Sequence, residues 1–190
     1  MVPLLYISVA SEDRIAVFRR SLDNCSLEAL PHLDCHIEGS PGAMCHMRLP
    51  SGHQRMYCVC SRGGVPGVAT VAVDEQTGGL VELGWAPAAF DDFASYLSTD
   101  RSGSFLFSAY YSAGGCAVHR ILADGTIGGL NDRHITAPQA HAIDIDATNS
   151  LVLVPHVYVW LSSRTPFDTQ LPNYMVTSAS QSSERCVPQG

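Results

Sequence analysis

The chain has 190 residues, a formal net charge of −7, 46% hydrophobic residues and 15% charged residues. This much apolar sequence can form the core of one domain, and it excludes disorder over most of the length. The 11 lysines and arginines against 18 acidic residues do not supply the clustered basic face that phosphate backbones need, so nucleic acid is excluded as an expected partner.

The beginning of the chain reads as strand sequence and not as a leader. It has no basic region, and Glu12 and Asp13 arrive before an apolar signal core could finish. We find no run near the roughly 20 apolar residues of a membrane-spanning helix, so we expect no membrane partner. Seven cysteines without a regular framework predict free thiols in a reducing compartment, and hence a cytoplasmic protein.

Short apolar runs separated by Gly, Asp and Ser turns predict strands along the chain, with no helix longer than about a turn. The clearest hairpin joins 105–107 to 116–121 through the small-residue turn 112–115. Similar strands are predicted at 4–9, 15–18, 56–59, 68–73, 80–83 and 151–154, with a turn at 62–67.

These strands recur at a fixed spacing. Tyr6 and Tyr57 are 51 positions apart, Tyr57 and Phe107 are 50 apart, and Phe107 and Leu153 are 46 apart. A period near 50 built from strands is typical of a β-propeller, whereas a β-sandwich does not predict such self-similarity. We therefore expect an all-β fold, an incomplete β-propeller with about three and a half four-stranded antiparallel blades, in which segments such as 93–98 and 140–145 close a repeat.

The composition changes near residue 158. Residues 161–190 are rich in Ser, Thr, Gln and Pro, and 174–177 is the strand-like piece within them. We expect a partial propeller domain at 1–157 and a poorly ordered tail at 158–190.

Several segments resemble one family in the same order. They are Tyr6-Ile7-Ser8 with Ile15-Ala16-Val17-Phe18, the stretch 97–118, and Gln139-Ala140-His141-Ala142-Ile143-Asp144-Ile145-Asp146 leading to Val154-Pro155. Together they resemble the seven-bladed β-propeller lactonases, which include 6-phosphogluconolactonases and carboxymuconate cycloisomerases. The resemblance implies hydrolysis of 6-phosphogluconolactone to 6-phosphogluconate in the pentose phosphate pathway, with a small sugar-phosphate lactone as partner and no cofactor.

The chain departs from the family pattern after Pro155. Roughly half of the seven blades is present, and the family's arginine and glutamate in later blades have no counterpart, so the chain resembles a truncated member. A half ring leaves open blade edges with unpaired backbone groups, which predicts self-association.

Lactone hydrolysis needs a base that activates water. His141 matches the family's histidine, and a neutral imidazole can accept a proton at cellular pH, so His141 is the candidate catalytic residue; a structural histidine between blades is the alternative. Arg133 and Tyr111 are the candidate substrate-binding residues, and His156 could lie on the same face. A surface arginine and a packed aromatic are the alternatives for Arg133 and Tyr111.

The sequence does not show the residue patterns of a metal site, a nucleotide-binding loop or a serine nucleophile. The pairs Cys35-His36 and Cys45-His46 are adjacent residues that do not easily point at one ion, so no metal site is predicted. Gly63-Gly64 and Gly114-Gly115 are read as turns because no helix follows them. No strained serine elbow is present. Two other functions stay open: a non-catalytic propeller fragment or binding module, and cycloisomerase chemistry on a muconate.

Overall fold

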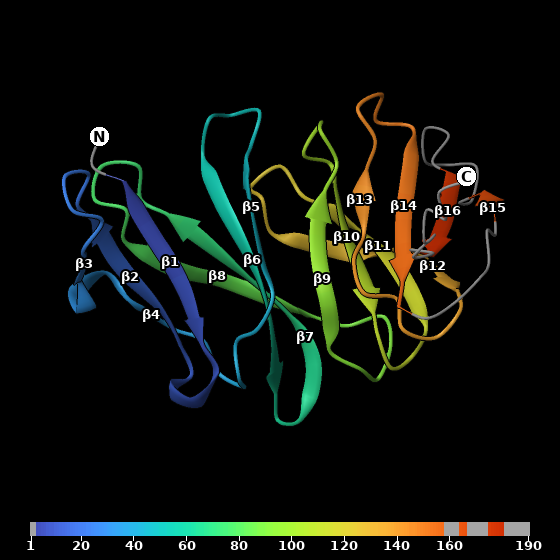
Figure 1. Ribbon diagram of the computed structural model, residues 1–190, viewed down its shortest axis with the longest axis horizontal. Coiled ribbons are helices and arrows are strands. Elements are labelled where there is room, and N and C mark those ends of the chain that lie inside the picture. Colours follow the sequence, from blue (N-terminus) through green and yellow to red (C-terminus); the bar gives the residue numbers. More distant parts are fainter. Residues whose placement is uncertain (1–2, 158–163, 167–174, 181–190) are drawn as a thin grey trace, which may run out of the picture.

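The computed structural model describes residues 3–157, 164–166 and 175–180, and these form four sheets placed side by side in chain order (Figure 1). Within the described residues the helical elements are two three-residue 3-10 turns, Ala10–Glu12 and Pro31–Leu33. None of the helices in this part of the chain is long and apolar enough to cross a membrane. The predicted all-β fold, a partial β-propeller, is confirmed.

Each sheet is built from strands that follow one another in sequence. Sheet 1 contains β1 (Leu4–Val9), β2 (Arg14–Arg20), β3 (Leu27–Ala29) and β4 (Cys35–His36); sheet 2 contains β5 (Met44–Arg48), β6 (Gln54–Arg62), β7 (Val65–Val73) and β8 (Leu80–Pro87). Sheet 3 contains β9 (Ala94–Thr99), β10 (Phe105–Tyr110), β11 (Gly115–Ile121) and β12 (Ile127–Ile135); sheet 4 contains β13 (Asp144–Ile145), β14 (Leu151–His156), β15 (Arg164–Pro166) and β16 (Met175–Ser180).

The sheets are offset from the sequence repeat by one strand. The segment 93–98, expected to close a repeat, overlaps β9, and β9 pairs with β10 of the next sheet. Likewise β5 pairs with β6 and β13 with β14. The expectation that these segments complete the preceding blade is therefore wrong, because antiparallel pairing joins each of them to the strand that follows it across a short turn.

Sheet 1 has three strand positions because no strand among the described residues pairs with the other edge of β1. Its third position is shared by β3 and β4, which pair with opposite ends of β2. Where this third strand is interrupted, the Asp34 carboxylate accepts the Val17 N–H at 2.8 Å in place of a strand carbonyl. Asp34 also forms an ion pair with Arg14.

Sheet 4 departs from the antiparallel pattern of the other sheets. β13 and β14 pair antiparallel, but β14 pairs with β16 in parallel, with Leu151 opposite Met175. The predicted antiparallel blades are thus found in sheets 1–3, and the departure falls where the sequence leaves the repeat pattern. The predicted strand-like piece near 175–177 lies in β16; the remainder of the predicted tail, apart from β15, lies outside the described residues.

The core consists of three apolar layers between neighbouring sheets. Alternate residues of each inner strand point to opposite faces, so one strand contributes to two layers. In β6, Cys58 faces sheet 1 and Tyr57 faces sheet 3; in β10, Leu106 faces sheet 2 and Phe107 faces sheet 4. The Tyr57 hydroxyl donates to the Gly125 carbonyl of sheet 3 at 2.8 Å, which ties two sheets together.

The turns show why the repeats fold alike. Gly63 and Gly64 alone connect β6 to β7, with φ angles of 54° and 81° that suit a two-residue hairpin, so the turn is tighter than the predicted 62–67. Asp100 and Asp146 begin equivalent turns. Each carboxylate accepts the backbone N–H groups four and five residues ahead, those of Ser104 and Phe105 in the first turn, at 2.7 and 2.8 Å.

Candidate functional site

Three connections meet at one end of sheets 3 and 4: the loop 88–93, the turn 111–114 and the loop 136–143. The Asp92 carboxylate accepts the N–H groups of Ser112 and Ala113 at 3.0 and 2.9 Å, which binds the first loop to the turn. The Gln139 N–H donates to the Tyr111 carbonyl at 2.8 Å, which binds the turn to the second loop. Segments about 50 residues apart in sequence are therefore held as one rim.

Two of the three predicted site residues touch each other in this rim. The rings of Tyr111 and His141 meet edge to face, with centroids 5.9 Å apart. His141 is exposed and Tyr111 is half-buried, so the imidazole is open to water while the phenol supports it. The His141 N–H donates to the Pro155 carbonyl at 3.0 Å, which fixes the backbone that carries the imidazole to β14.

Arg133 lies on the outermost strand of sheet 3, β12, and faces the first loop. Its guanidinium donates to the Ala89 carbonyl at 2.9 Å and lies 5.6 Å from the centre of the Phe90 ring. Phe90 in turn packs on Tyr110, whose hydroxyl accepts the Ala89 N–H at 3.2 Å. The structure thus brings Tyr111 and His141 into contact, whereas the described contacts of Arg133 are with the first loop of the rim.

His156 lies beside the second loop. His156 is 5% exposed, and its Nδ1 lies 3.1 Å from the Pro138 carbonyl oxygen. Its backbone forms an antiparallel bridge with that of Ala140. Because a carbonyl oxygen can only accept, Nδ1 is the donor in the hydrogen bond with Pro138. Within the described part of the chain, Nε2 is buried and has no hydrogen-bond partner.

Sequence reasoning missed a third histidine near the rim, His134. His134 Nε2 and Asp132 Oδ2 are 3.2 Å apart on β12, and both side chains are about one-fifth exposed. The signal was available, because residues two apart in a strand share a face. Sequence reasoning also missed Asp92, which precedes β9 and caps the turn through two backbone N–H groups. An aspartate in a loop is a common sign of a turn, because its carboxylate can accept backbone N–H groups.

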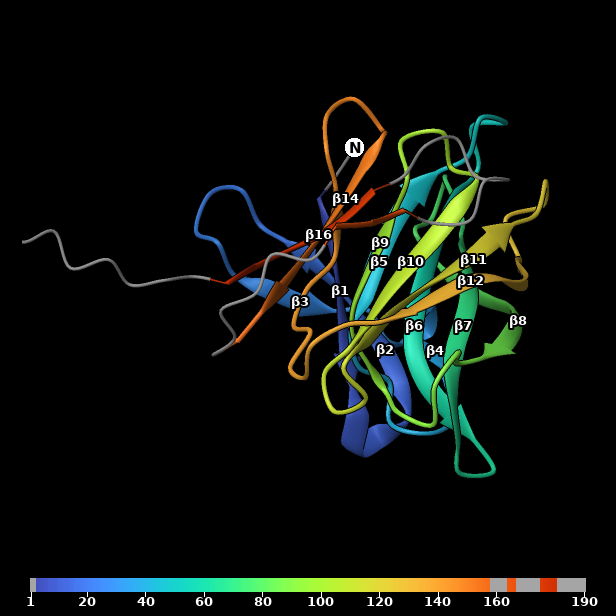
Figure 2. The same ribbon diagram turned by 90° about the vertical axis from the view of Figure 1, so that its right-hand side faces the viewer.

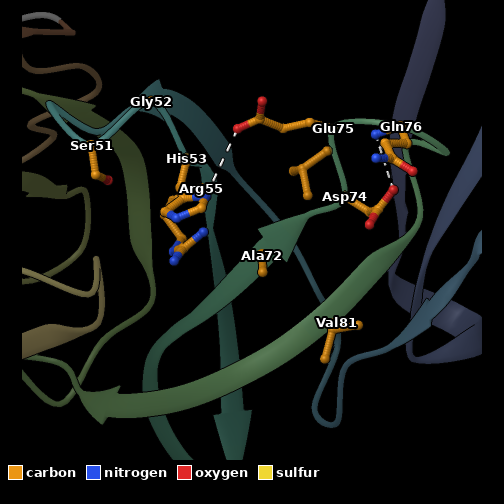
Figure 3. Close-up of a pocket in the computed structure, with 10 residues that line it drawn as sticks. Ser51, Gly52, His53, Arg55, Ala72, Asp74, Glu75, Gln76 and Val81 are labelled. Carbon is orange, nitrogen blue, oxygen red and sulfur yellow. Dashed lines mark hydrogen bonds and ion pairs between the residues drawn. The ribbon is translucent and has the colours of Figure 1, made fainter.

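A separate hollow of about 590 Å³ lies between the turn 51–53 and the loop 74–76 of sheet 2 (Figure 3). His53 and Glu75 face each other across it with Nδ1 and Oε1 3.9 Å apart. The Asp74 carboxylate instead accepts the N–H groups of Gln76 and Thr77, at 3.0 and 2.7 Å, which holds the loop and lowers the pKa of Asp74. The hollow is thus lined by one exposed histidine, His53, and by two exposed acids, of which Asp74 is bonded to its own loop.

The sequence predicts no metal site at the two pairs Cys35-His36 and Cys45-His46. Cys35 is buried and Cys45 half-buried, in different sheets, and His46 Nε2 lies 2.9 Å from Gln54 Oε1. In the described residues no three His, Cys, Asp or Glu side chains gather where a metal ion could bind. The six cysteines of this part of the chain are free thiols, and burial raises the pKa of Cys45 to about 12.

The sequence matches the family described as "Lactonase, 7-bladed beta-propeller" over residues 7–157. It is 30% identical over 158 residues to the 6-phosphogluconolactonase of Serratia proteamaculans, covering 82% of this chain and 44% of that one. It is 39% identical over 88 residues to the 6-phosphogluconolactonase of Pectobacterium atrosepticum, covering 46% of this chain and 26% of that protein. The chain therefore spans less than half the length of these relatives.

Solved propellers share the fold at low sequence identity. A candidate 6-phosphogluconolactonase from Bacteroides uniformis aligns over 90% of this chain and 52% of its own length, with a TM-score of 0.67 and 18% identity. The periplasmic gluconolactonase of Pseudomonas aeruginosa aligns over 70% of this chain and 37% of its own, with a TM-score of 0.55 and 17% identity.

Proposed function

Because the chain belongs to the family of seven-bladed β-propeller lactonases, we propose that it binds a small-molecule lactone and hydrolyses it. The family match over residues 7–157 carries this proposal. The names of the curated relatives indicate 6-phosphogluconolactone as the substrate and 6-phosphogluconate as the product. The exposed His141 at the rim supports it, because a lactonase needs a base in contact with water.

In the proposed reaction, His141 accepts a proton from a water molecule as the water oxygen attacks the lactone carbonyl carbon. The tetrahedral intermediate then collapses, the ring C–O bond breaks, and the leaving alkoxide takes the proton from His141. The products are one carboxylic acid, which ionises in water, and one hydroxyl group. Tyr111 contributes by holding the imidazole edge, since its ring contacts that of His141.

Arg133 is the proposed contact for the anionic part of the substrate. Its side chain is exposed, and a guanidinium offers donors in a fork that suits phosphate oxygens. Its contacts with Ala89 and Phe90 hold the guanidinium beside the first loop of the rim. We further propose a reducing compartment, the cytoplasm, because the described cysteines are unpaired.

The test is hydrolysis of 6-phosphogluconolactone by the purified chain, with proton release followed above the spontaneous rate. We expect His141→Ala to reduce kcat/KM by about 10²- to 10⁴-fold, the usual contribution of a general base. Arg133→Ala should mainly raise KM. His53→Ala is the matched control, since His53 is an exposed histidine in the other hollow.

Four results would count against the proposal. Hydrolysis no faster than the spontaneous rate would favour a binding module without activity. Equal rates for the wild type and His141→Ala would remove His141 from the mechanism. A loss in His53→Ala with none in His141→Ala would move the site to the hollow in sheet 2. Turnover of a muconate lactone in place of the sugar lactone would indicate cycloisomerase chemistry.

A further inference from the structure

We propose that His156 is a positioning residue for His141, and that it holds the loop 136–143 in the bend that turns the His141 imidazole to water. This role rests on the function proposed above, because it takes His141 as the base. His156 ends β14, the strand of sheet 4 that lies beside sheet 3 in both views (Figure 1 and Figure 2). It is 5% exposed, so it acts through the loop and not by contact with a substrate.

The loop contains a strained residue two positions before His141. Gln139 has a φ of 67°, in the left-handed region that residues other than glycine rarely adopt. The chain then alternates, since Ala140 is fully buried and His141 is exposed. A strained backbone persists only where its surroundings impose it. The contacts around Gln139 therefore decide whether the imidazole faces water.

Backbone and hydroxyl groups hold the bend from Gln139 onward. The Gln139 N–H donates to the Tyr111 carbonyl at 2.8 Å, and the Gln139 carbonyl accepts the Val157 N–H at 3.1 Å. The Ser95 hydroxyl donates to the Ala140 carbonyl at 2.9 Å. These bonds fix the peptide groups that follow the strained residue.

His156 holds the peptide group that precedes the strained residue. Its Nδ1 donates to the Pro138 carbonyl at 3.1 Å, and its backbone bridges Ala140. Residues paired in antiparallel strands present their side chains to the same face, and both of these side chains are buried. His156 is thus bound on both sides of Gln139, through its imidazole to Pro138 and through its backbone to Ala140.

The imidazole acts through one atom. Within the described residues, Nε2 of His156 is buried and has no hydrogen-bond partner, whereas Nδ1 is bonded to Pro138. Loss of the Nδ1 donor leaves a carbonyl unpaired and frees the peptide plane before Gln139, so the strained φ can relax. Rotation at Gln139 moves the residues after it, and His141 is two residues farther on.

The test compares His156→Ala with His156→Asn. The asparagine amide nitrogen takes the place of Nδ1 and can donate to Pro138, whereas alanine has no donor. We expect alanine to reduce kcat for 6-phosphogluconolactone about 10- to 100-fold with KM changed less than about twofold, and asparagine to keep most of kcat. His119→Ala is the matched control and should keep kcat, because His119 is also 5% exposed but pairs with Leu106 and Leu130 within sheet 3.

Two further measurements address the bend itself. Glycine adopts a positive φ without strain, so adding Gln139→Gly to His156→Ala should raise kcat again by about threefold or more. Hydrogen exchange followed by NMR needs no activity. The amides of Gln139 and His141, which donate to the Tyr111 and Pro155 carbonyls, should exchange about tenfold faster in His156→Ala and near the wild-type rate in His156→Asn.

The two readouts separate this role from the proposed function. A wild type that does not hydrolyse the lactone contradicts the proposed function, and the exchange rates then decide whether His156 holds the loop. In an active protein, an unchanged kcat or unchanged exchange in His156→Ala would overturn the proposal. An equal loss of kcat in His119→Ala, or no recovery with asparagine or with Gln139→Gly, would also overturn it.

Circular dichroism checks that each variant folds. Where His156→Ala does not fold, His156→Gln takes its place, because the glutamine amide reaches the position of Nε2 and not that of Nδ1. His156→Gln should then show the low kcat and the fast exchange, and His156→Asn should not. Equal behaviour of the glutamine and asparagine variants would contradict a role for the Nδ1 donor.

Discussion

Replacing Asp100 by alanine should destabilise the fold more than any other turn substitution near it. Asp100 is 3% exposed, and its carboxylate accepts the N–H groups of Ser104 and Phe105 at 2.7 and 2.8 Å. It also accepts the Ser102 N–H at 3.1 Å and the Asn149 side-chain amide at 3.3 Å. The last contact joins the turn of sheet 3 to the turn of sheet 4.

The expected loss follows from the groups left without a partner. The Phe105 N–H is buried and the Ser104 N–H is partly buried, so alanine leaves at least one donor with neither carboxylate nor free access to water. A hydrogen bond to a charged group contributes about 1.5–3 kcal/mol, and an unsatisfied buried donor costs about 1–3 kcal/mol. We therefore expect the free energy of unfolding to fall by about 3 kcal/mol.

The effect should also depend on pH. Burial alone would raise the pKa of Asp100, but the hydrogen bonds from Ser102, Phe105, Asn149 and Ser104 outweigh it and hold the pKa below its ordinary value of 3.8. A carboxyl group with a lowered pKa stabilises the fold above the unfolded-state pKa, and the contribution is lost as the pH falls through the folded-state pKa. The stability difference between the wild type and Asp100→Asn should thus be full at pH 7 and shrink below about pH 4.

Urea unfolding followed by circular dichroism at pH 7, 5 and 3 measures this. The matched control is Asp124→Ala, because the Asp124 carboxylate is exposed and the hydrogen bonds described for it come from the backbone N–H and the hydroxyl of Thr126. That variant should lose much less stability than Asp100→Ala. Equal losses in the two variants would refute the reasoning from burial, and a difference between wild type and Asp100→Asn that stays constant from pH 7 to 3 would refute the reasoning from charge.

Three further substitutions or labels test other features. Tyr57→Phe removes the bond between sheets 2 and 3 and leaves the Gly125 carbonyl unpaired, so unfolding free energy should fall by about 1–2 kcal/mol in urea titrations. Gly115→Ala would place a Cβ 2.5 Å from Phe90 Cζ, and thermal melts should show destabilisation of about 1–3 kcal/mol. Brief maleimide labelling with peptide mapping should modify the exposed Cys25 before the other five described cysteines.

The sequence predicted the fold well because a propeller repeats its local signals. The period near 50, the paired strands around Tyr57 and Phe107, and the Gly and Asp turns all correspond to observed sheets. The assignment of residues 93–98 to the preceding sheet was wrong. The spacing between equivalent residues is the same whichever strand is taken as the first of a repeat, so it does not show where one sheet ends and the next begins. Only pairing shows that β9 belongs with β10.

The site was predictable in part, for a physical reason. His141 and Tyr111 lie on connections that adjacent repeats place at the same end of the sheets, and they contact each other. Arg133 instead lies on β12, the outer edge strand of sheet 3, and not on one of these connections. Its partner is therefore the loop of the preceding sheet, at Ala89 and Phe90. Strand order within a sheet cannot be read from residue spacing, so the partners of Arg133 could be found only from the structure.

The one-strand offset between repeat and sheet has a consequence for how such a chain could be shortened or lengthened by evolution. The loss of one repeat, β6 to β9, removes three strands from sheet 2 and one strand from sheet 3. The strands left behind, β5 and β10 to β12, then follow one another in the sequence and supply the four strand positions of a single sheet. Genes of this kind should therefore change blade number by events that join the first strand of one sheet to the last three strands of another. A protease that cuts between β8 and β9, in contrast, should release pieces with intact sheets.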